Sequence, residues 1–123
     1  HQELEAFCKK HFNKAGFEEK IKLYIGNALE LIPTLNYKYD IVFIDADKKN
    51  YCKYYDLAIN KLKKGGCIII DNVLWSGKVT KVTKENDVET SEIKKLNLLI
   101  HNDSRVRNTL LPIRDGIMIC ELL

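Results

Sequence analysis

Two short apolar segments, each ending on a carboxylate, are the clearest feature of the hydrophobic pattern. Residues 41–45 end on Asp45, and residues 67–71 end on Asp71, which Asn72 follows. Their length and β-branched composition predict buried parallel strands, joined by a crossover through the helix-like segment between them. Because parallel strands end at the same edge of a sheet, we expect Asp45, Asp71 and Asn72 to converge there.

The rest of the pattern alternates helix-like and strand-like segments. Apolar residues spaced by three and four predict helices, and β-branched runs predict strands. In chain order we expect a helix at 2–15, a strand at 21–25, a brief helix at 29–35 interrupted by Pro33, the strand at 41–45, a helix at about 51–63 ended by Gly65 and Gly66, the strand at 67–71, a loop at 81–89, a helix capped by Thr90 or Ser91, and a hairpin of 106–111 and 117–122. His11, on the apolar face of the first helix, is expected to be packed or half-exposed. This order is typical of a parallel α/β sheet with an antiparallel hairpin at its edge.

The composition is that of an ordinary globular protein. At 123 residues, 46% of them hydrophobic, the chain is one domain or part of one. The net charge of +3 comes from lysines spread along the chain, so it argues only weakly for a polyanionic partner. The cysteines, Cys8, Cys52, Cys67 and Cys120, are far apart and are expected to be reduced thiols. With no signal peptide and no apolar run near ~18 residues, we expect a soluble, cytoplasmic protein with no membrane partner.

The three converging side chains offer only oxygen ligands. Two carboxylates at one place repel each other unless a cation lies between them, and carboxylate and amide oxygens suit a hard divalent ion such as magnesium, manganese or calcium. The pattern therefore predicts a divalent metal site formed by Asp45, Asp71 and Asn72. The alternative is that these residues only form turns, since Asp and Asn are favoured where strands end.

Four blocks of sequence extend this interpretation. Residues 43–51, 64–66, 71–79 and 111–116 resemble, in order and spacing, the cation-dependent class I O-methyltransferases. This family includes the caffeoyl-CoA and catechol O-methyltransferases and many small bacterial relatives. The resemblance covers essentially the whole chain. It implies a Rossmann-like α/β fold with a mostly parallel sheet and a C-terminal antiparallel hairpin. It also implies that residues 1–123 are the C-terminal part of a single methyltransferase domain, with S-adenosylmethionine (SAM) as the methyl donor.

The resemblance also implies roles for particular residues. Three residues match the protein ligands of the metal, namely Asp45, Asp71 and Asn72. Lys48 matches the lysine that takes the proton from the acceptor hydroxyl. The residues expected to contact SAM are Ala28, Asp45, Asp47 and Tyr54. The residues expected to line the acceptor pocket are Trp75, Ser76 and Asp115.

Several of these roles have a simpler structural alternative. Lys48 would be a solvated surface lysine in most sequences, although a neighbouring cation should lower its pKa, as a general base requires. Tyr51, Tyr54 and Tyr55 would simply be packing residues of one amphipathic helix. Asp115 would serve only the turn in which it lies.

The sequence departs from the family pattern in its acceptor region and at its N-terminal end. Ser76 replaces an asparagine that is common in the plant enzymes, and the loop at 78–92 is shorter than the plant substrate loop, which argues against a caffeoyl-CoA specialist. The glycine-rich loop after the family's first strand and the acidic residue that ends its second strand are absent. We therefore expect an N-terminally incomplete chain, in which the strand at 21–25 lacks the neighbour that would pair with its backbone.

Three functional hypotheses remain open. The leading one is metal-dependent methyl transfer from SAM to a hydroxyl of a catechol-like or phenolic small molecule. The second is methylation of a hydroxylated tRNA base such as hydroxyuridine, which the mild positive charge permits. The third is that the chain, lacking half of a cofactor pocket, acts only as a folding or dimerisation module. Because family members are often dimers, the resemblance also implies a homodimer.

Overall fold

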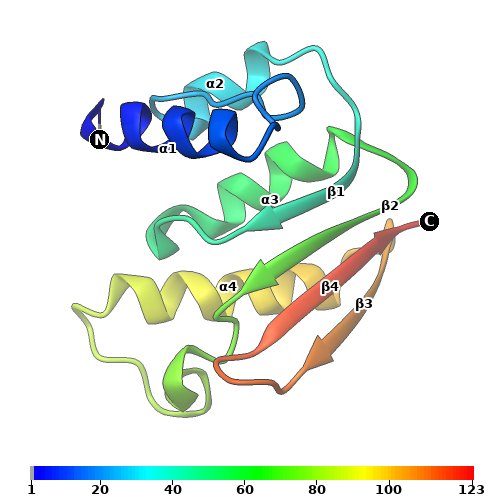
Figure 1. Ribbon diagram of the computed structural model, residues 1–123. Coiled ribbons are helices and arrows are strands. Elements are labelled where there is room, and N and C mark those ends of the chain that lie inside the picture. Colours follow the sequence, from blue (N-terminus) through cyan, green and yellow to red (C-terminus); the bar gives the residue numbers. More distant parts are fainter. Residues whose placement is uncertain (1) are drawn as a thin grey trace. The chain divides into compact units, whose positions relative to one another are not determined.

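A computed structural model describes residues 2–123 and divides the chain into two units (Figure 1). The unit His1–Leu35 contains α1 (Gln2–Lys14) and α2 (Ala28–Thr34). The unit Asn36–Leu123 contains β1 (Tyr39–Ile44), η1 (Lys48–Asn50), α3 (Tyr51–Ile59), β2 (Leu62–Asp71), η2 (Trp75–Thr80), α4 (Val88–His101), β3 (Val106–Leu111) and β4 (Ile117–Leu122). In the described part of the chain, no helix is long and apolar enough to cross a lipid bilayer.

The larger unit is built on a four-stranded sheet with the strand order β1-β2-β4-β3 (Figure 1). β1 and β2 run parallel, with Ile44 opposite Ile70, and α3 lies between them in the chain as the crossover. β4 runs antiparallel to both β2 and β3. The predicted parallel pair and the predicted hairpin at the edge of the sheet are therefore confirmed.

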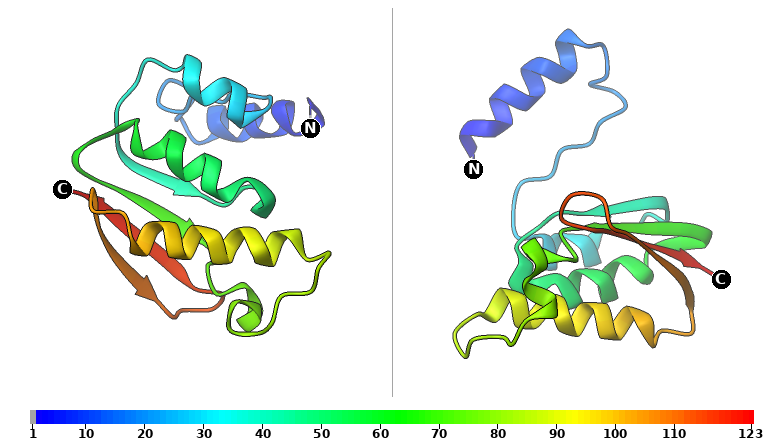
Figure 2. Two further views of the ribbon diagram at one scale, coloured as in Figure 1. Left: turned by 180° about the vertical axis from the view of Figure 1, so that it is seen from behind. Right: turned by 90° about the horizontal axis from the view of Figure 1, so that it is seen from below.

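The core lies between this sheet and two helices. Figure 2 shows α3 and α4 on the same face of the sheet. The buried residues of the sheet include Ile44, Ile68, Ile70, Met118 and Cys120, and those of the helices include Tyr55, Ala58, Ile59, Ile93, Leu96 and Ile100. Burial of a large apolar side chain stabilises the fold by about 1.5–3 kcal/mol. This layer therefore fixes the strand ends on which the candidate site is built. All four cysteines are free thiols, as predicted.

The helix predicted at 51–63 is shorter than expected, because its last residues belong to β2. Tyr39 of β1 pairs with Leu62 of β2, whereas Ile41, two residues further along β1, pairs with Cys67 of β2. The two strands therefore change register between these pairs. Gly65 and Gly66 lie in this irregular stretch. Gly65 has a φ of +75°, and a Cβ on Gly66 would lie 2.9 Å from the carbonyl oxygen of Asp40. The prediction that the glycines end the helix is therefore wrong, because they form a bulge in a strand.

The strand predicted at 21–25 is also wrong. In the described residues this segment lies outside every strand, and Ile21, Tyr24 and Ile25 are 40%, 47% and 42% exposed. A β-branched run becomes a strand only where another strand accepts and donates its backbone hydrogen bonds. None of the described strands pairs with this segment.

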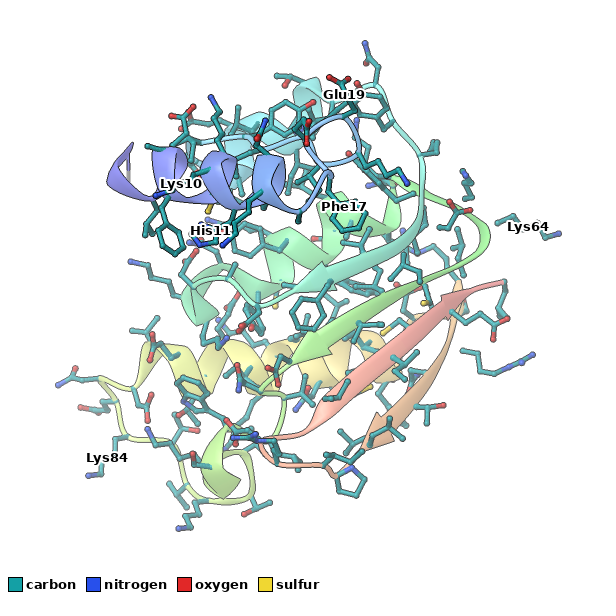
Figure 3. All side chains as sticks on the ribbon, viewed as in Figure 1. Lys10, His11, Phe17, Glu19, Lys64 and Lys84 are labelled. Carbon is teal, nitrogen blue, oxygen red and sulfur yellow. The ribbon has the colours of Figure 1, made fainter. Side chains whose placement is uncertain are left out.

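The predicted apolar face of α1 is largely exposed. Leu4 and Phe7 are 56% and 59% exposed. His11, labelled in Figure 3, is exposed rather than packed in a core. Its ring lies 4.1 Å from that of Phe7, and its Nδ1 lies 2.8 Å from the Phe7 carbonyl oxygen.

The N-terminus of α4 differs by a few residues from the predicted cap. Asp87 is the N-cap, and its side chain accepts a hydrogen bond from the backbone nitrogen of Thr90 at 3.1 Å. Thr90 is itself inside the helix and buried. The predicted cap at Thr90 or Ser91 is therefore wrong, because an aspartate satisfies the free N–H groups of a first turn as well as Thr or Ser does.

An ion pair between the buried carboxylate of Asp103 and the exposed Arg105 fixes the chain between α4 and β3. Arg105 donates from Nε and Nη2 to the two carboxylate oxygens of Asp103, at 2.9 and 2.7 Å. The hydroxyl of Tyr55, from α3, donates to the same carboxylate at 2.9 Å. The Asp103 side chain is 8% exposed, and the hydrogen bonds from Arg105 hold its pKa well below the usual range in spite of burial.

We expect Asp103→Asn to lower the free energy of unfolding near neutral pH by about 1–3 kcal/mol, because it removes the buried charge to which Arg105 and Tyr55 donate hydrogen bonds. Since the folded-state pKa of Asp103 is lowered, its contribution is present above about pH 4 and is lost as the pH falls toward the folded-state value. Urea unfolding at neutral and acidic pH should therefore show a difference between wild type and variant that shrinks on acidification. The control Asp40→Asn breaks an exposed pair with Lys63 and should change stability by about 0–1 kcal/mol. Equal losses in the two variants would contradict the account.

Candidate active site

The predicted metal ligands meet at the carboxyl ends of β1 and β2. Asp45 follows β1 directly, and Asp71 is the last residue of β2. Because Ile44 and Ile70 are paired in the sheet, the residues that follow them are neighbours. The carboxylates of Asp45 and Asp71 also lie near the same buried side chain, Tyr51, because the negative charge of each helps to raise its pKa. The structure therefore brings the two strand ends together as the sequence predicted.

Asn72 completes the set of oxygen ligands. Its backbone nitrogen donates to Asp71 Oδ1 at 2.7 Å, and its Nδ2 donates to Asp115 Oδ2 at 3.3 Å. In residues 2–123, no group of three or more His, Cys, Asp or Glu side chains is placed to hold a metal, so a site here would depend on two carboxylates and one amide. The Asp45 side chain is 51% exposed and open to a ligand. The donor chemistry of these residues fits a hard divalent cation.

Lys48 is buried beside these carboxylates. It is 9% exposed, so the alternative of a solvated surface lysine is wrong. Its Nζ donates to Asp45 Oδ1 at 2.9 Å, to the Ala46 carbonyl oxygen at 3.2 Å and to the Tyr51 hydroxyl at 2.5 Å. Burial lowers the pKa of Lys48, but the hydrogen bonds to Tyr51 and Asp45 outweigh burial and hold it above the ordinary value. The chain's own groups thus act against the lowering that was expected beside a cation.

Two of the four residues predicted to contact SAM, Asp47 and Tyr54, contact each other. Tyr54 donates from its hydroxyl to Asp47 Oδ1 at 2.5 Å, and Asn50 donates from Nδ2 to Asp47 Oδ2 at 2.5 Å. Burial raises the pKa of Asp47, but these hydrogen bonds outweigh it and hold the pKa below its ordinary value. Burial and the contact with Asp47 raise the pKa of Tyr54 to about 12. Ala28, the third predicted contact, begins α2 in the other unit and stays a prediction.

The loop after β2 adopts backbone conformations that side chains usually avoid. The φ angles of Asn72, Trp75 and Ser76 are 63°, 48° and 52°. Such angles are uncommon outside glycine and cost on the order of 1–3 kcal/mol each, so neighbouring contacts must hold them. In proteins, conformations of this kind gather at ligand sites.

Asp115 is the main contact that holds this loop. Its Oδ2 accepts from Asn72 and its Oδ1 from the backbone nitrogen of Ser76. Its carbonyl oxygen accepts from the Leu74 nitrogen at 2.9 Å, and the Gly116 carbonyl accepts from Val73 at 3.2 Å. The sequence left open whether Asp115 lines a pocket or only forms a turn. In the structure, Asp115 also holds the conformation of the loop that carries Asn72, a candidate metal ligand.

Two of the three residues predicted to line the acceptor pocket, Trp75 and Ser76, lie on the loop after β2, whereas Asp115 lies between β3 and β4. The Trp75 ring centroid is 6.0 Å from Nζ of Lys48 and 5.6 Å from Nζ of Lys78. Its indole nitrogen is buried, and none of the described residues forms a hydrogen bond with it. Ser76 is exposed. Sequence reasoning missed Tyr51, which it treated as a packing residue. The spacing of three residues from Asp45 to Lys48 and again from Lys48 to Tyr51 was the available signal.

Comparison with known proteins identifies the family. The sequence pattern of the O-methyltransferase family matches residues 1–123. The chain belongs to the O-methyltransferase family. A relative in Dictyostelium discoideum, named "Probable caffeoyl-CoA O-methyltransferase 1", is 42% identical to this O-methyltransferase chain over 113 residues, which cover 88% of the chain and 49% of that protein. The chain spans about half the length of the curated relatives it matches.

Solved structures of O-methyltransferases share the fold. TomG of Streptomyces achromogenes, an O-methyltransferase involved in tomaymycin synthesis and solved in complex with SAM, matches with a TM-score of 0.89 at 21% identity, over 99% of this chain and 58% of its own. An O-methyltransferase of Bacillus cereus, solved in complex with SAH, matches with a TM-score of 0.83 at 27% identity, over 94% of this chain and 56% of its own. The predicted Rossmann-like methyltransferase fold is therefore confirmed.

The loop after β2 and the turn between β3 and β4 approach each other closely at Leu74 and Gly116. Gly116 has a φ of +82°, and a Cβ there would lie 2.5 Å from Cγ of Leu74. Gly65 has a similar φ of +75° but nothing within 4 Å of such a Cβ. We expect Gly65→Ala to cost about 1 kcal/mol of unfolding free energy from backbone strain, and Gly116→Ala to cost about 1–3 kcal/mol more from the clash. Urea unfolding of both variants measures the difference, and equal losses would mean that the loops do not need this approach.

Proposed function

We propose that the full-length protein transfers a methyl group from SAM to a hydroxyl of a catechol-like small molecule, with the help of a divalent cation. The observation that carries this proposal is the convergence of Asp45, Asp71, Asn72 and the buried Lys48 at one edge of the sheet. Membership of the O-methyltransferase family supports the type of reaction. The Dictyostelium relative, named as a caffeoyl-CoA O-methyltransferase, supports a phenolic acceptor.

SAM is the methyl donor in this proposal. The complexes of the Streptomyces and Bacillus structures with SAM and SAH support it. Asp47 and Tyr54 would hold the donor. Because Asn50 and Tyr54 both bond Asp47, the carboxylate is already oriented before a ligand arrives. Such preorganisation lowers the cost of ordering side chains on binding.

Asp45, Asp71 and Asn72 would hold the cation. A bound divalent ion at this place supplies Lewis acidity, which lowers the pKa of an acceptor hydroxyl, and it orients neighbouring oxygens. Asp115 keeps Asn72 in its unusual backbone conformation and so keeps the ligand set together. An acceptor with two adjacent hydroxyls fits such a site best.

The remaining residues would position the acceptor and take up its proton. Nζ of Lys48 lies next to Asp45. A cation held by Asp45 would lower the pKa of Lys48, and the neutral amine would then accept the hydroxyl proton. The Trp75 ring, close to the same amine, offers a flat apolar surface for an aromatic ring. Orientation supplies most of the rate increase in this scheme, because the sulfonium of SAM is already a reactive donor.

The first test concerns the cation. We expect chelation by excess EDTA to abolish methyl transfer to a catechol, and magnesium or manganese to restore it, because the ligand set consists of oxygens. Asp71→Ala should lose activity that added cation does not restore. Asp40→Ala, which removes an exposed carboxylate near the other end of β1, serves as the control and should stay active. Full activity of wild type in excess EDTA would exclude the cation from the reaction.

The second test concerns Lys48. We expect Lys48→Ala to lower kcat by roughly 10²–10⁴-fold, the range for a positioned acid or base, and to leave SAM affinity nearly unchanged. Lys49→Ala is the matched control, because Lys49 is the next residue and is exposed. Steady-state kinetics and calorimetry with SAM separate the two effects. A loss of SAM binding in Lys48→Ala would instead assign the lysine a structural role.

The lysines of the loop before α4 bear on the alternative acceptor, a hydroxylated tRNA base. Lys84 projects outward from this loop (Figure 3). Nζ of Lys78 lies 3.9 Å from Asp87, so part of its charge is already compensated within the chain. A mild excess of charge with partial internal pairing favours the small-molecule acceptor.

The third test therefore compares the two acceptors. Phosphate contacts release counterions, so RNA methylation should fall steeply between roughly 50 and 200 mM salt, whereas catechol methylation should barely change. We expect the enzyme to methylate a simple catechol such as caffeic acid with little salt dependence, and Lys78→Ala, Lys81→Ala and Lys84→Ala together to change turnover only slightly. The control replaces three other exposed lysines, Lys53, Lys63 and Lys64. A kcat/KM that is far higher for hydroxyuridine-containing tRNA, and lost in the first triple variant only, would identify tRNA as the substrate.

A further inference from the structure

Tyr51 reaches the candidate site from inside the core. It is the first residue of α3 and is 0% exposed. Its hydroxyl lies 2.5 Å from Nζ of Lys48, and its ring centroid lies 4.7 Å from the same atom. In the proposed reaction Lys48 takes up the hydroxyl proton, and no step has yet been assigned to Tyr51.

The three hydrogen-bond partners of the Lys48 amine differ in their surroundings. Asp45 is half-exposed and is a candidate ligand of the cation, so its carboxylate would be shared when the site is loaded. The Ala46 carbonyl oxygen is the most distant of the three, at 3.2 Å. The Tyr51 hydroxyl is the nearest and is buried. A phenol can both accept and donate, so this contact persists whether the lysine is an ammonium or an amine.

The first turn of α3 is itself held by α4. The backbone nitrogen of Cys52 donates to Glu92 Oε1 at 3.3 Å, and its thiol donates to the Glu92 carbonyl oxygen at 3.8 Å. The Glu92 side chain is only 15% exposed. Tyr51 is therefore attached to a packed part of the fold, whereas Asp45 lies on the chain between β1 and η1.

We propose that Tyr51 is a positioning residue, whose buried hydroxyl holds the Lys48 amine at the carboxyl edge of the sheet. This inference rests on the proposed function, because it gives Tyr51 a task only if Lys48 acts on the acceptor. A lysine side chain has many rotamers, and a general base must lie within hydrogen-bond reach of the proton it takes. Tyr51 restricts that freedom from the side of the amine that faces the core.

The test is a double-mutant cycle in the full-length protein. We expect Tyr51→Phe to lower kcat for catechol methylation roughly tenfold, as for the loss of one well-placed hydrogen bond, and to keep KM for SAM within about twofold. In a Lys48→Ala background, Tyr51→Phe should change kcat by less than about twofold, because the amine that it positions is gone. 4-Aminophenylalanine at position 51 restores a hydrogen-bonding group and should recover most of the wild-type kcat.

Tyr55→Phe is the matched control. Tyr55 lies on the same helix, is also 0% exposed and also uses its hydroxyl, but the partner is Asp103. It should lower the melting temperature without lowering kcat. Calorimetry with SAM shows which variants are folded.

The outcomes separate the two claims. An unchanged kcat in Tyr51→Phe, or an equal loss in the wild-type and Lys48→Ala backgrounds, would overturn the positioning role while Lys48→Ala still shows that the lysine is needed. If Lys48→Ala itself keeps full kcat, the proposed function fails in its proton-transfer step, and the inference fails with it.

Discussion

The parallel pairing of β1 with β2 is the constraint on which the site depends. It aligns Ile44 with Ile70, so that both strands end at the same level and Asp45 and Asp71 become neighbours. The apolar layer beneath, with Ile44, Ile68 and Ile70 buried against α3 and α4, resists any slip of this register. A slip by one residue would turn one carboxylate to the opposite face of the sheet. The chemistry at the edge therefore relies on packing within the core.

Two carboxylates held side by side need positive charge nearby, and the fold supplies part of it. Nζ of Lys48 contacts Asp45 and lies under the Trp75 ring. On the other side, Asp115 draws the loop after β2 into backbone conformations that only a dense set of contacts can hold. Structure and proposed chemistry thus meet in the same residues. The groups that stabilise the strand ends are those that would place a cation, a base and a flat acceptor.

The sequence pattern was most informative where the interactions are local or occur between regular strands. The strand at 41–45 and the hairpin of 106–111 and 117–122 were predicted from clear runs of apolar residues. In the structure these strands have nearly the predicted bounds. The prediction that Gly65 and Gly66 end a helix was wrong, because a pair of glycines is equally suited to a helix end and to a strand bulge. Only the pairing of β2 with β1 decides between these two structures. The pattern also misled at 21–25 because a strand depends on its neighbour and not on its own residues alone. It missed Tyr51 because a tyrosine three residues after Lys48 also suits a packing residue of an amphipathic helix, and only the structure shows the contact between its hydroxyl and Lys48.

The central claim is that the ends of β1 and β2 form a cation site in a member of the O-methyltransferase family, and cation binding tests it most directly. Titration of the full-length protein with manganese, followed by the electron paramagnetic resonance signal of the free ion, counts bound ions without any assumption about the acceptor. The account predicts one ion per chain, with binding lost in Asp71→Asn and kept in Asp40→Asn. Manganese binding of equal strength in wild type and Asp71→Asn would contradict it.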